Sequence, residues 1–200
     1  LAISPRGIVA GDAEKWYRQY WEIFNFSNRW RPLQTAVLRS CDFSGRHVIV
    51  DWSTEGVGML RPGHANIAYG KYGVALSRMS MLPSTLFTGE HYDQSTAVIV
   101  PLDPTIIPAL WAACETGNLA ASVRKIDQKL NVTPATFLKV PFDLSHWIEV
   151  AAEKYPQGLP KPFSSDPTQW LFNGHPKGAD QPLQVAVARL LGYRWPRQTG

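Results

Sequence analysis

The sequence predicts an α+β fold, with a small mixed or antiparallel sheet, packed helices and a small helical C-terminal unit. Three observations lead to this prediction. Short β-branched runs come early in the chain, helical spacing of apolar residues dominates after Pro101, and a proline-rich stretch precedes the last helical pattern. Strands that come first, with helices interleaved later, are typical of α+β domains.

A helix is predicted near the N-terminus, where Asp12 is placed to cap its first turn. Five aromatic residues then share one face at helical spacing. They are Trp16, Tyr17, Tyr20, Trp21 and Phe24. We expect this helix to end near residues 25–27.

Strands are predicted over 46–52 (RHVIVDW) and 96–100 (TAVIV), and the second should stop at Pro101 because proline cannot donate to a ladder. Residues 56–63 are rich in glycine and proline, so they are expected to form a loop. The segments 65–69 and 72–78 flank Gly70-Lys71, a pattern that is consistent with a hairpin. A brief strand is expected over 137–140.

Helices are predicted over 108–114 and 118–130, on either side of Gly117, with Ile126 and Leu130 buried. Asp143 is expected to cap a further amphipathic helix that runs to Tyr155. The last helix should begin at Asp180, with Pro182 in its first turn, and end at Gly192.

These patterns divide the chain into three parts: a domain over 1–155, a proline-rich linker over 156–165 and a helical C-terminal appendage over 166–200. In the appendage, Asp166-Pro167 is expected to start a helix.

Composition narrows the possible partners. The chain has 200 residues, 44% of them hydrophobic, a net charge of +4 and a pI near 9.1. This mild basicity permits a polyanionic partner without requiring one. No apolar run approaches the roughly 18 residues of a membrane span, and no signal peptide precedes the domain, so we expect a cytoplasmic protein without a membrane partner. Cys41 and Cys114 lack metal-site spacing and are expected to be reduced. Because the chain begins at Leu1, we expect it to be a piece of a longer protein.

Several side chains have the chemistry to contact duplex DNA. Lys71 and Tyr72 fall at the predicted hairpin tip, where side chains are exposed. Arg78 is a candidate to read guanine, with an ion pair inside the domain as the alternative. Tyr72, like Tyr69, either stacks on a base or packs within the fold.

A cationic helix is the second candidate contact. Arg124, Lys125 and Lys129 lie within 118–130, and Lys139 extends the same surface. They either clamp phosphates or form the solvated face of an ordinary amphipathic helix.

Four motifs carry a resemblance to a known family. They are G-K-x-G-V at 70–74, T-G-E-x-Y-D at 88–93, V-R-K-I-D-Q-K-L at 123–130 and K-V-P-F-D-L-x-x-W at 139–147. Together they resemble the C-terminal target-recognition region, of TaqI-like specificity type, of bacterial adenine-specific DNA methyltransferases in restriction and phage-defence systems. The N-terminal segment 7–16 is similar to a G-x-x-T-G-D-N-x-x-F signature of these enzymes, with Ala10 in place of threonine and Ala13 in place of asparagine.

The resemblance implies sequence-specific binding of double-stranded DNA, as the partner of a methyltransferase domain in the parent chain. S-adenosylmethionine would then belong to that parent enzyme, and we expect no cofactor, catalytic residue or metal in this chain. Adenine methylation needs an Asn/Asp-Pro-Pro-Tyr/Phe loop, and no Pro-Pro pair occurs here. Gly56-Val57-Gly58 lacks the strand–helix context of a cofactor loop.

Two other classes of function stay open. A protein-interaction or scaffold domain would dock a partner subunit through the aromatic face of residues 16–24. A self-contained enzyme would need a deep pocket lined by acid–base groups. The run Glu90-His91-Tyr92-Asp93 has such side chains, although an acid–His–acid run of this kind is more often a polar loop. The five histidines show no metal-binding spacing.

Overall fold

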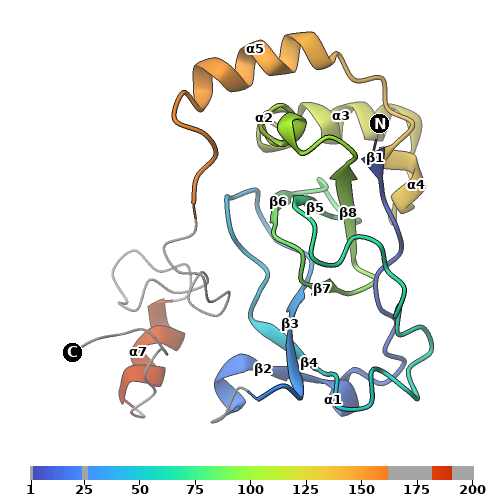
Figure 1. Cartoon of the computed structure of the whole chain (residues 1–200), viewed down its shortest axis with the longest axis vertical. Coiled ribbons are helices and arrows are strands. Elements are labelled where there is room, and N and C mark those ends of the chain that lie inside the picture. Colours follow the sequence, from blue (N-terminus) through green and yellow to red (C-terminus); the bar gives the residue numbers. More distant parts are fainter. Residues whose placement is uncertain (1, 24–26, 162–181, 191–200) are drawn as a thin grey trace.

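The computed structural model describes residues 2–23, 27–161 and 182–190. It contains two four-stranded sheets and several short helices, which confirms the α+β prediction. The sequence predicted a single sheet, whereas the strands divide between two. Figure 1 shows helices α2 to α5 gathered on one side of the first sheet, while most of the second sheet lies on the opposite side, near α1.

The first sheet has the order β1-β8-β5-β6 and is antiparallel throughout. Its strands are β1 (Ala2–Ile3), β8 (Thr96–Pro101), β5 (Gly73–Ser77) and β6 (Ser84–Phe87). Every residue of β5, β6 and β8 is buried, because helices cover one face and loops the other. This burial explains why β8 is a continuous apolar run without alternation.

The second sheet has the order β2-β4-β3-β7. It comprises β2 (Tyr17–Gln19), β4 (Val48–Asp51), β3 (Trp30–Gln34) and β7 (His91–Tyr92). The pairs β2–β4 and β3–β4 are antiparallel, whereas β3 and β7 run parallel. Since β7 follows β6 after a short turn, the chain passes from one sheet to the other at residues 88–90.

The helices build a core against the first sheet. They are η2 (Pro104–Ile106), α2 (Ile107–Glu115), α3 (Asn118–Ile126), α4 (Pro134–Phe137) and α5 (Leu144–Lys154). Gly117, with φ at +78°, makes the turn between α2 and α3. Trp111 of α2 and Val123 of α3 are fully buried in the same cluster as Leu76 of β5.

The N-terminal helix is much shorter than predicted. Asp12 does cap it, accepting a hydrogen bond from the Lys15 backbone N–H at 3.1 Å, but α1 spans only Ala13–Trp16. The next three residues form β2 because they pair with β4. A three-residue 3₁₀ helix, η1 (Tyr20–Glu22), follows. The predicted continuous helix over 12–24 is therefore wrong, and Phe24 lies outside the described residues.

The predicted hairpin around Gly70-Lys71 is also wrong. Residues 65–69 form turns, and β5 pairs with β6 and β8 instead. Gly73 permits the pairing with β8, because a Cβ there would lie 2.2 Å from the Ile99 carbonyl oxygen. Lys71 consequently stands in a loop before β5.

Two further predictions fail in the helical region. The helix predicted over 118–130 ends at Ile126, and Ile126 and Leu130 are 51% and 71% exposed instead of buried. The strand predicted over 137–140 is absent from the described fold: Phe137 closes α4 and residues 138–139 turn.

Other elements agree with the sequence. The strands β4 and β8, the loop over 56–63 and helix α2 form where predicted, and the Asp143 carboxylate caps α5 by accepting from the His146 N–H at 3.1 Å. Helix α7 (Pro182–Leu190) is present, and Val185 packs against Tyr20, Trp30 and Ile49. The predicted ends of this last helix, Asp180 and Gly192, lie outside the described residues, as do Asp166 and residues 162–165 of the linker.

The contrast between buried and exposed apolar residues gives a stability test. Trp111→Ala should lower the free energy of unfolding by about 3–5 kcal/mol, because it empties a fully buried site. Leu130→Ala should change it by less than about 0.5 kcal/mol, because that side chain is largely exposed. Urea denaturation measures both, and a large effect of Leu130→Ala would contradict its placement.

Candidate nucleic-acid interface

The G-K-x-G-V and T-G-E-x-Y-D motifs meet through a contact between Gly70 and Gly89. The Gly70 N–H donates to the Gly89 carbonyl oxygen at 2.8 Å. Both residues have positive φ, +73° and +103°, and a Cβ on Gly89 would lie 2.7 Å from the Gly70 Cα. A larger residue at position 89 would therefore push the two loops apart. The contact joins G-K-x-G-V to T-G-E-x-Y-D and fixes the loop that carries Lys71.

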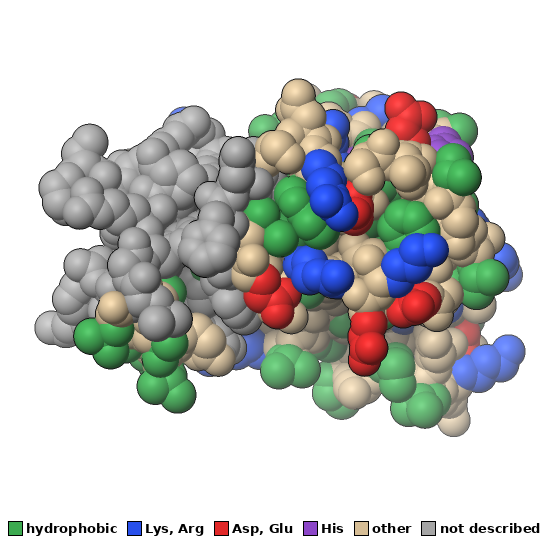
Figure 2. All heavy atoms as spheres, turned by 90° about the horizontal axis from the view of Figure 1, so that it is seen from below, with side chains coloured by type: hydrophobic (Ala, Val, Ile, Leu, Met, Phe, Trp, Pro, Cys, Tyr) green, Lys and Arg blue, Asp and Glu red, His purple; other side chains and the backbone are tan. Residues whose placement is uncertain are grey.

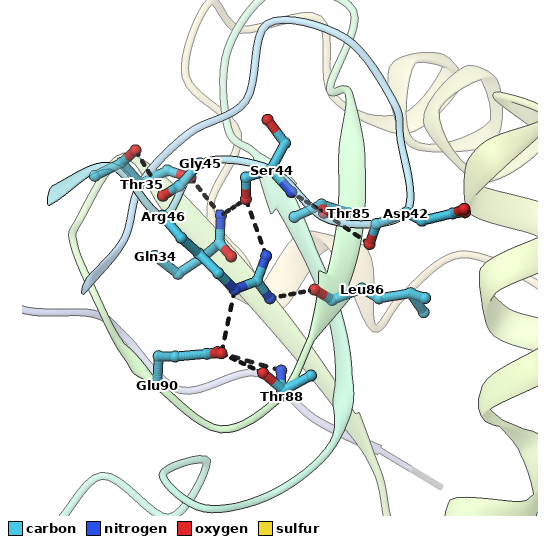
Figure 3. A network of polar contacts seen from close by, with 10 residues as sticks. All are labelled: Gln34, Thr35, Asp42, Ser44, Gly45, Arg46, Thr85, Leu86, Thr88 and Glu90. Atoms are coloured by element: carbon cyan, nitrogen blue, oxygen red, sulfur yellow. Dashed lines mark hydrogen bonds and ion pairs between the residues drawn. The ribbon is translucent and has the colours of Figure 1, made fainter. Parts of the chain in front are cut away.

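A buried ion pair between Arg46 and Glu90 holds the T-G-E-x-Y-D motif in place (Figure 3). The Arg46 Nε lies 3.1 Å from Glu90 Oε1, and both side chains are almost fully buried. The Arg46 guanidinium also donates to the carbonyl oxygens of Ser44 at 3.0 Å and Leu86 at 2.6 Å. Thr88 contributes its backbone N–H and its hydroxyl to the same carboxylate. The network therefore ties the loop before β4 to β6 and to the crossing between the sheets.

Arg46 and Glu90 each shift the pKa of the other. Burial opposes ionisation of Glu90, but the Arg46 guanidinium and the Thr88 hydrogen bonds outweigh it and keep the pKa of Glu90 below its usual range. Burial also lowers the pKa of Arg46, against the attraction of Glu90. Sequence reasoning missed Arg46, because nothing local distinguishes an arginine that finds a carboxylate 44 residues away.

Removing one charge of the pair should therefore be costly. Glu90→Gln should lower the free energy of unfolding by about 3–5 kcal/mol near neutral pH, because it leaves the Arg46 charge buried without compensation. The depressed pKa of Glu90 means that its contribution is present above the unfolded pKa and is lost as the pH falls through the folded pKa. Denaturation of this variant beside the exposed control Glu149→Gln is the measurement, and equal effects would show that the pair contributes nothing.

The N-terminal signature packs against the same segment. The Ile8 N–H donates to the Tyr92 carbonyl oxygen at 2.8 Å, and the Tyr92 hydroxyl donates to the Pro5 carbonyl oxygen at 3.0 Å. A Cβ on Gly7 would lie 2.3 Å from the Asp93 carbonyl oxygen. Three of the resembling segments, distant in sequence, thus form one packed unit.

A groove of about 1080 Å³ opens beside this unit. It runs between the start of β5, the crossing at 88–91, β3, the start of α2 and the segment 159–161. Tyr69, Tyr72 and His91 line it with aromatic surface, and Arg31 and Lys161 supply cationic side chains. Glu90 is its only carboxylate among the described residues, and Arg46 neutralises that charge. The groove therefore disfavours cations.

The acid–base pair considered from the sequence is not poised for catalysis near neutral pH. The His91 ring stacks against Tyr69, with centroids 4.2 Å apart, and meets Trp52 edge-on at 4.3 Å. Burial, aided by the positive charge of Arg31, lowers the pKa of His91 to about 4. His91 is consequently neutral at pH 7, and Glu90 is committed to Arg46.

His91 should make stability depend on pH. Its folded pKa of about 4 lies below the ordinary 6.5, so the fold favours the neutral ring. The resulting stabilisation is fully present above pH 6.5 and is lost as the pH falls toward 4, by about 3 kcal/mol in total. His91→Phe keeps an aromatic ring but cannot titrate, so its free energy of unfolding should vary less over that range. If the free energy of unfolding depended on pH in the same way in wild type and in His91→Phe, the low pKa assigned to His91 would be contradicted.

The structure separates the predicted DNA contacts into two groups. Lys71 and Tyr72 precede β5, both exposed, with Tyr72 at the groove. Arg78 follows β5, so it lies about 20 Å from Tyr72 by the rise of an extended strand. The sequence placed Lys71 at a hairpin tip and Arg78 after the strand that follows it; that strand forms, but the predicted hairpin does not.

Arg78 is a bracing residue in this fold. Its Nε donates to the Val132 carbonyl oxygen at 2.7 Å and its Nη1 to that of Gln94 at 2.5 Å, while the Val132 N–H returns a bond to the Arg78 carbonyl oxygen at 2.9 Å. The guanidinium binds carbonyl groups instead of the carboxylate that the sequence alternative expected.

Arg124 has a similar role. Its Nη2 donates to the Ser80 carbonyl oxygen at 2.6 Å, and its Nη1 to that of Lys129. Lys125, Lys129 and Lys139 are exposed. Because α3 ends at Ile126, the predicted four-residue pairing of Lys125 with Lys129 does not form on a helix, although both lysines stay near Arg124.

Charges at the α1 end of the molecule are mixed. Figure 2 views the α1 end of the molecule, where lysine and arginine side chains alternate with aspartate and glutamate. Such a surface gives a polyanion no net attraction. Within the described ranges no three metal-binding side chains come together, and no helix there has the length and apolarity to cross a bilayer.

No protein-family model and no curated protein matches the chain.

Proposed function

We propose that this chain binds double-stranded DNA as the target-recognition part of an adenine-specific DNA methyltransferase of a restriction or phage-defence system. In this proposal the chain grips the duplex in the cytoplasm and helps to select the sequence. The methyltransferase domain of the parent protein binds S-adenosylmethionine and transfers the methyl group.

The observation that carries the proposal is the packed unit formed by the resembling segments. The Gly70–Gly89 contact and the hydrogen bond from the Ile8 N–H to the Tyr92 carbonyl oxygen hold three of those segments together. A chance likeness between scattered short motifs would not require them to meet in space. The unit also presents Lys71 and Tyr72 on a fixed loop, which is how binding side chains are commonly displayed.

The exposed lysines supply the second support. Lys125, Lys129 and Lys139 are exposed around the end of α3, and among residues 124–139 only Asp127 is acidic. The Asp127 carboxylate already accepts hydrogen bonds from the Lys129 N–H and the Thr136 hydroxyl. Flexible lysines suit sequence-independent contacts with phosphates.

The two rival functions lose support. The aromatic face proposed for docking a partner is not free, because Trp16 and Tyr20 are buried in different clusters. The groove does contain Glu90 and His91, but neither has a pKa suited to proton transfer near pH 7.

Duplex binding should weaken steeply with salt. Each lysine that contacts a phosphate contributes about −0.9 to the slope of log K against log salt, so Lys125→Gln, Lys129→Gln and Lys139→Gln combined should make that slope shallower by up to about 3. Fluorescence anisotropy with a short mixed-sequence duplex measures it. Lys15→Gln is the matched control, because it removes an exposed lysine from α1 at the mixed-charge end of the molecule.

Two results would contradict the proposal. One is no duplex binding at low salt by the chain alone or with the methyltransferase domain present. The other is an equal loss of salt dependence in the control and in the triple variant.

A further inference from the structure

The connection between β5 and β6 exposes two methionines at its tip. The tip, Met79–Met81, is solvent-exposed, with Met79 at 43% and Met81 at 82%. It is the turn of a true hairpin, since β5 and β6 pair directly from Leu76–Ser84 onward. The two methionines stand two residues apart on one turn, so together they form an exposed apolar projection.

The tip is held rigidly. Leu82, next to it, is 1% exposed and anchored in the core with Val123. Arg124 donates to the Ser80 carbonyl oxygen at 2.6 Å, which ties the tip to the last turn of α3. Ser80 and Leu82 both have positive φ, +56° and +54°, an uncommon conformation for residues with side chains. The arginine bond and the buried leucine therefore keep the methionines presented.

The surroundings of the tip are cationic. Arg124 also donates to the Lys129 carbonyl oxygen, so the backbone of Lys129 and the tip share one guanidinium. Lys125 and Lys129 are both exposed: Lys125 follows Arg124 in the chain, and the Lys129 carbonyl oxygen binds the Arg124 guanidinium. The nearest acid along this segment, Asp127, is satisfied by the Lys129 N–H at 3.0 Å. The tip thus combines an apolar projection with flanking positive charge.

We propose that the Met79–Met81 tip is a wedge that inserts between neighbouring base pairs of the bound duplex while Lys125 and Lys129 hold the adjacent phosphates. The wedge rests on the duplex binding proposed above. Proteins that unstack DNA insert side chains of this kind, including methionine, and recover the cost of unstacking through added contacts. A protruding tip suits insertion better than a flat docking surface, and the lysines match the charge of a phosphate backbone.

A duplex in which the stacking of one base step is already weakened tests the proposed insertion directly. The probes are a short mixed-sequence duplex and the same duplex with one central abasic site. Wild type should bind the abasic duplex more tightly, because part of the unstacking cost is already met. Met81→Ala should weaken binding to the intact duplex by about tenfold and to the abasic duplex by much less, with an unchanged salt slope.

Further variants and an optical readout separate insertion from a structural role. Met81→Leu should restore binding, because it restores an apolar projection. Leu102→Ala removes another exposed apolar side chain, 69% exposed and outside this hairpin, and should have no effect. 2-Aminopurine placed along the duplex should brighten with wild type and stay quenched with Met81→Ala.

The possible failures are distinguishable. Salt-dependent duplex binding that ignores both the abasic site and Met81→Ala would overturn the wedge and leave the proposed function standing. If Met81→Ala abolished binding to the methyltransferase domain while duplex binding stayed intact, the tip would be a protein contact, and the wedge proposal would be overturned. Absence of any duplex binding would overturn both proposals.

Discussion

The Arg46–Glu90 ion pair is the interaction on which the arrangement of the two sheets depends. Arg46 precedes β4 in one sheet and donates to the carbonyl oxygen of Leu86 in the other. Its partner, Glu90, lies where the chain crosses from β6 to β7. One buried guanidinium therefore satisfies a carboxylate and two carbonyl groups at the junction. A buried pair of this kind contributes little net stability, but the loss of either partner leaves an uncompensated buried charge at the junction.

The same junction forms a wall of the groove and supports its rim. Gly89 immediately precedes Glu90, and its contact with Gly70 transmits the fixed position of the pair to the loop of Lys71 and Tyr72. The exposed side chains consequently stand on a backbone that has little freedom to move. Less ordering is then required when a ligand binds, which favours affinity.

The sequence predicted elements best where the pattern was local. The apolar run of β8 and the Asp143 cap of α5 follow from short-range rules, and both formed as expected. The predictions failed where pairing between strands distant in sequence decided which element a segment forms. Tyr17–Gln19 has aromatic helical spacing, yet pairing with β4 makes it a strand. Residues 65–69 resemble a hairpin arm, yet β5 finds its partners in β6 and β8.

The candidate site was predictable in composition but not in geometry. The exposure of Lys71, Tyr72 and Lys129 agrees with their expected surface positions. Arg78 and Arg124 were chosen as cations, and the fold uses them to bind carbonyl groups. No rule based on spacing anticipates this, because both acceptors belong to loops that only the tertiary structure brings near. Arg46 was missed for the same reason.

Arginine and lysine side chains have different roles in this fold. A planar guanidinium with five donors is suited to satisfying several carbonyl groups, and Arg46, Arg78 and Arg124 all do so. The lysines remain at the surface, and in the proposed function they contact phosphates without regard to sequence. Bidentate recognition of guanine by Arg78 or Arg124 would break hydrogen bonds that brace the β5–β6 hairpin. Selectivity at this part of the proposed interface is therefore better obtained through the deformability of the DNA, because base steps differ in the free energy needed to unstack them. An apolar tip held by arginines and flanked by lysines is consistent with that form of selection.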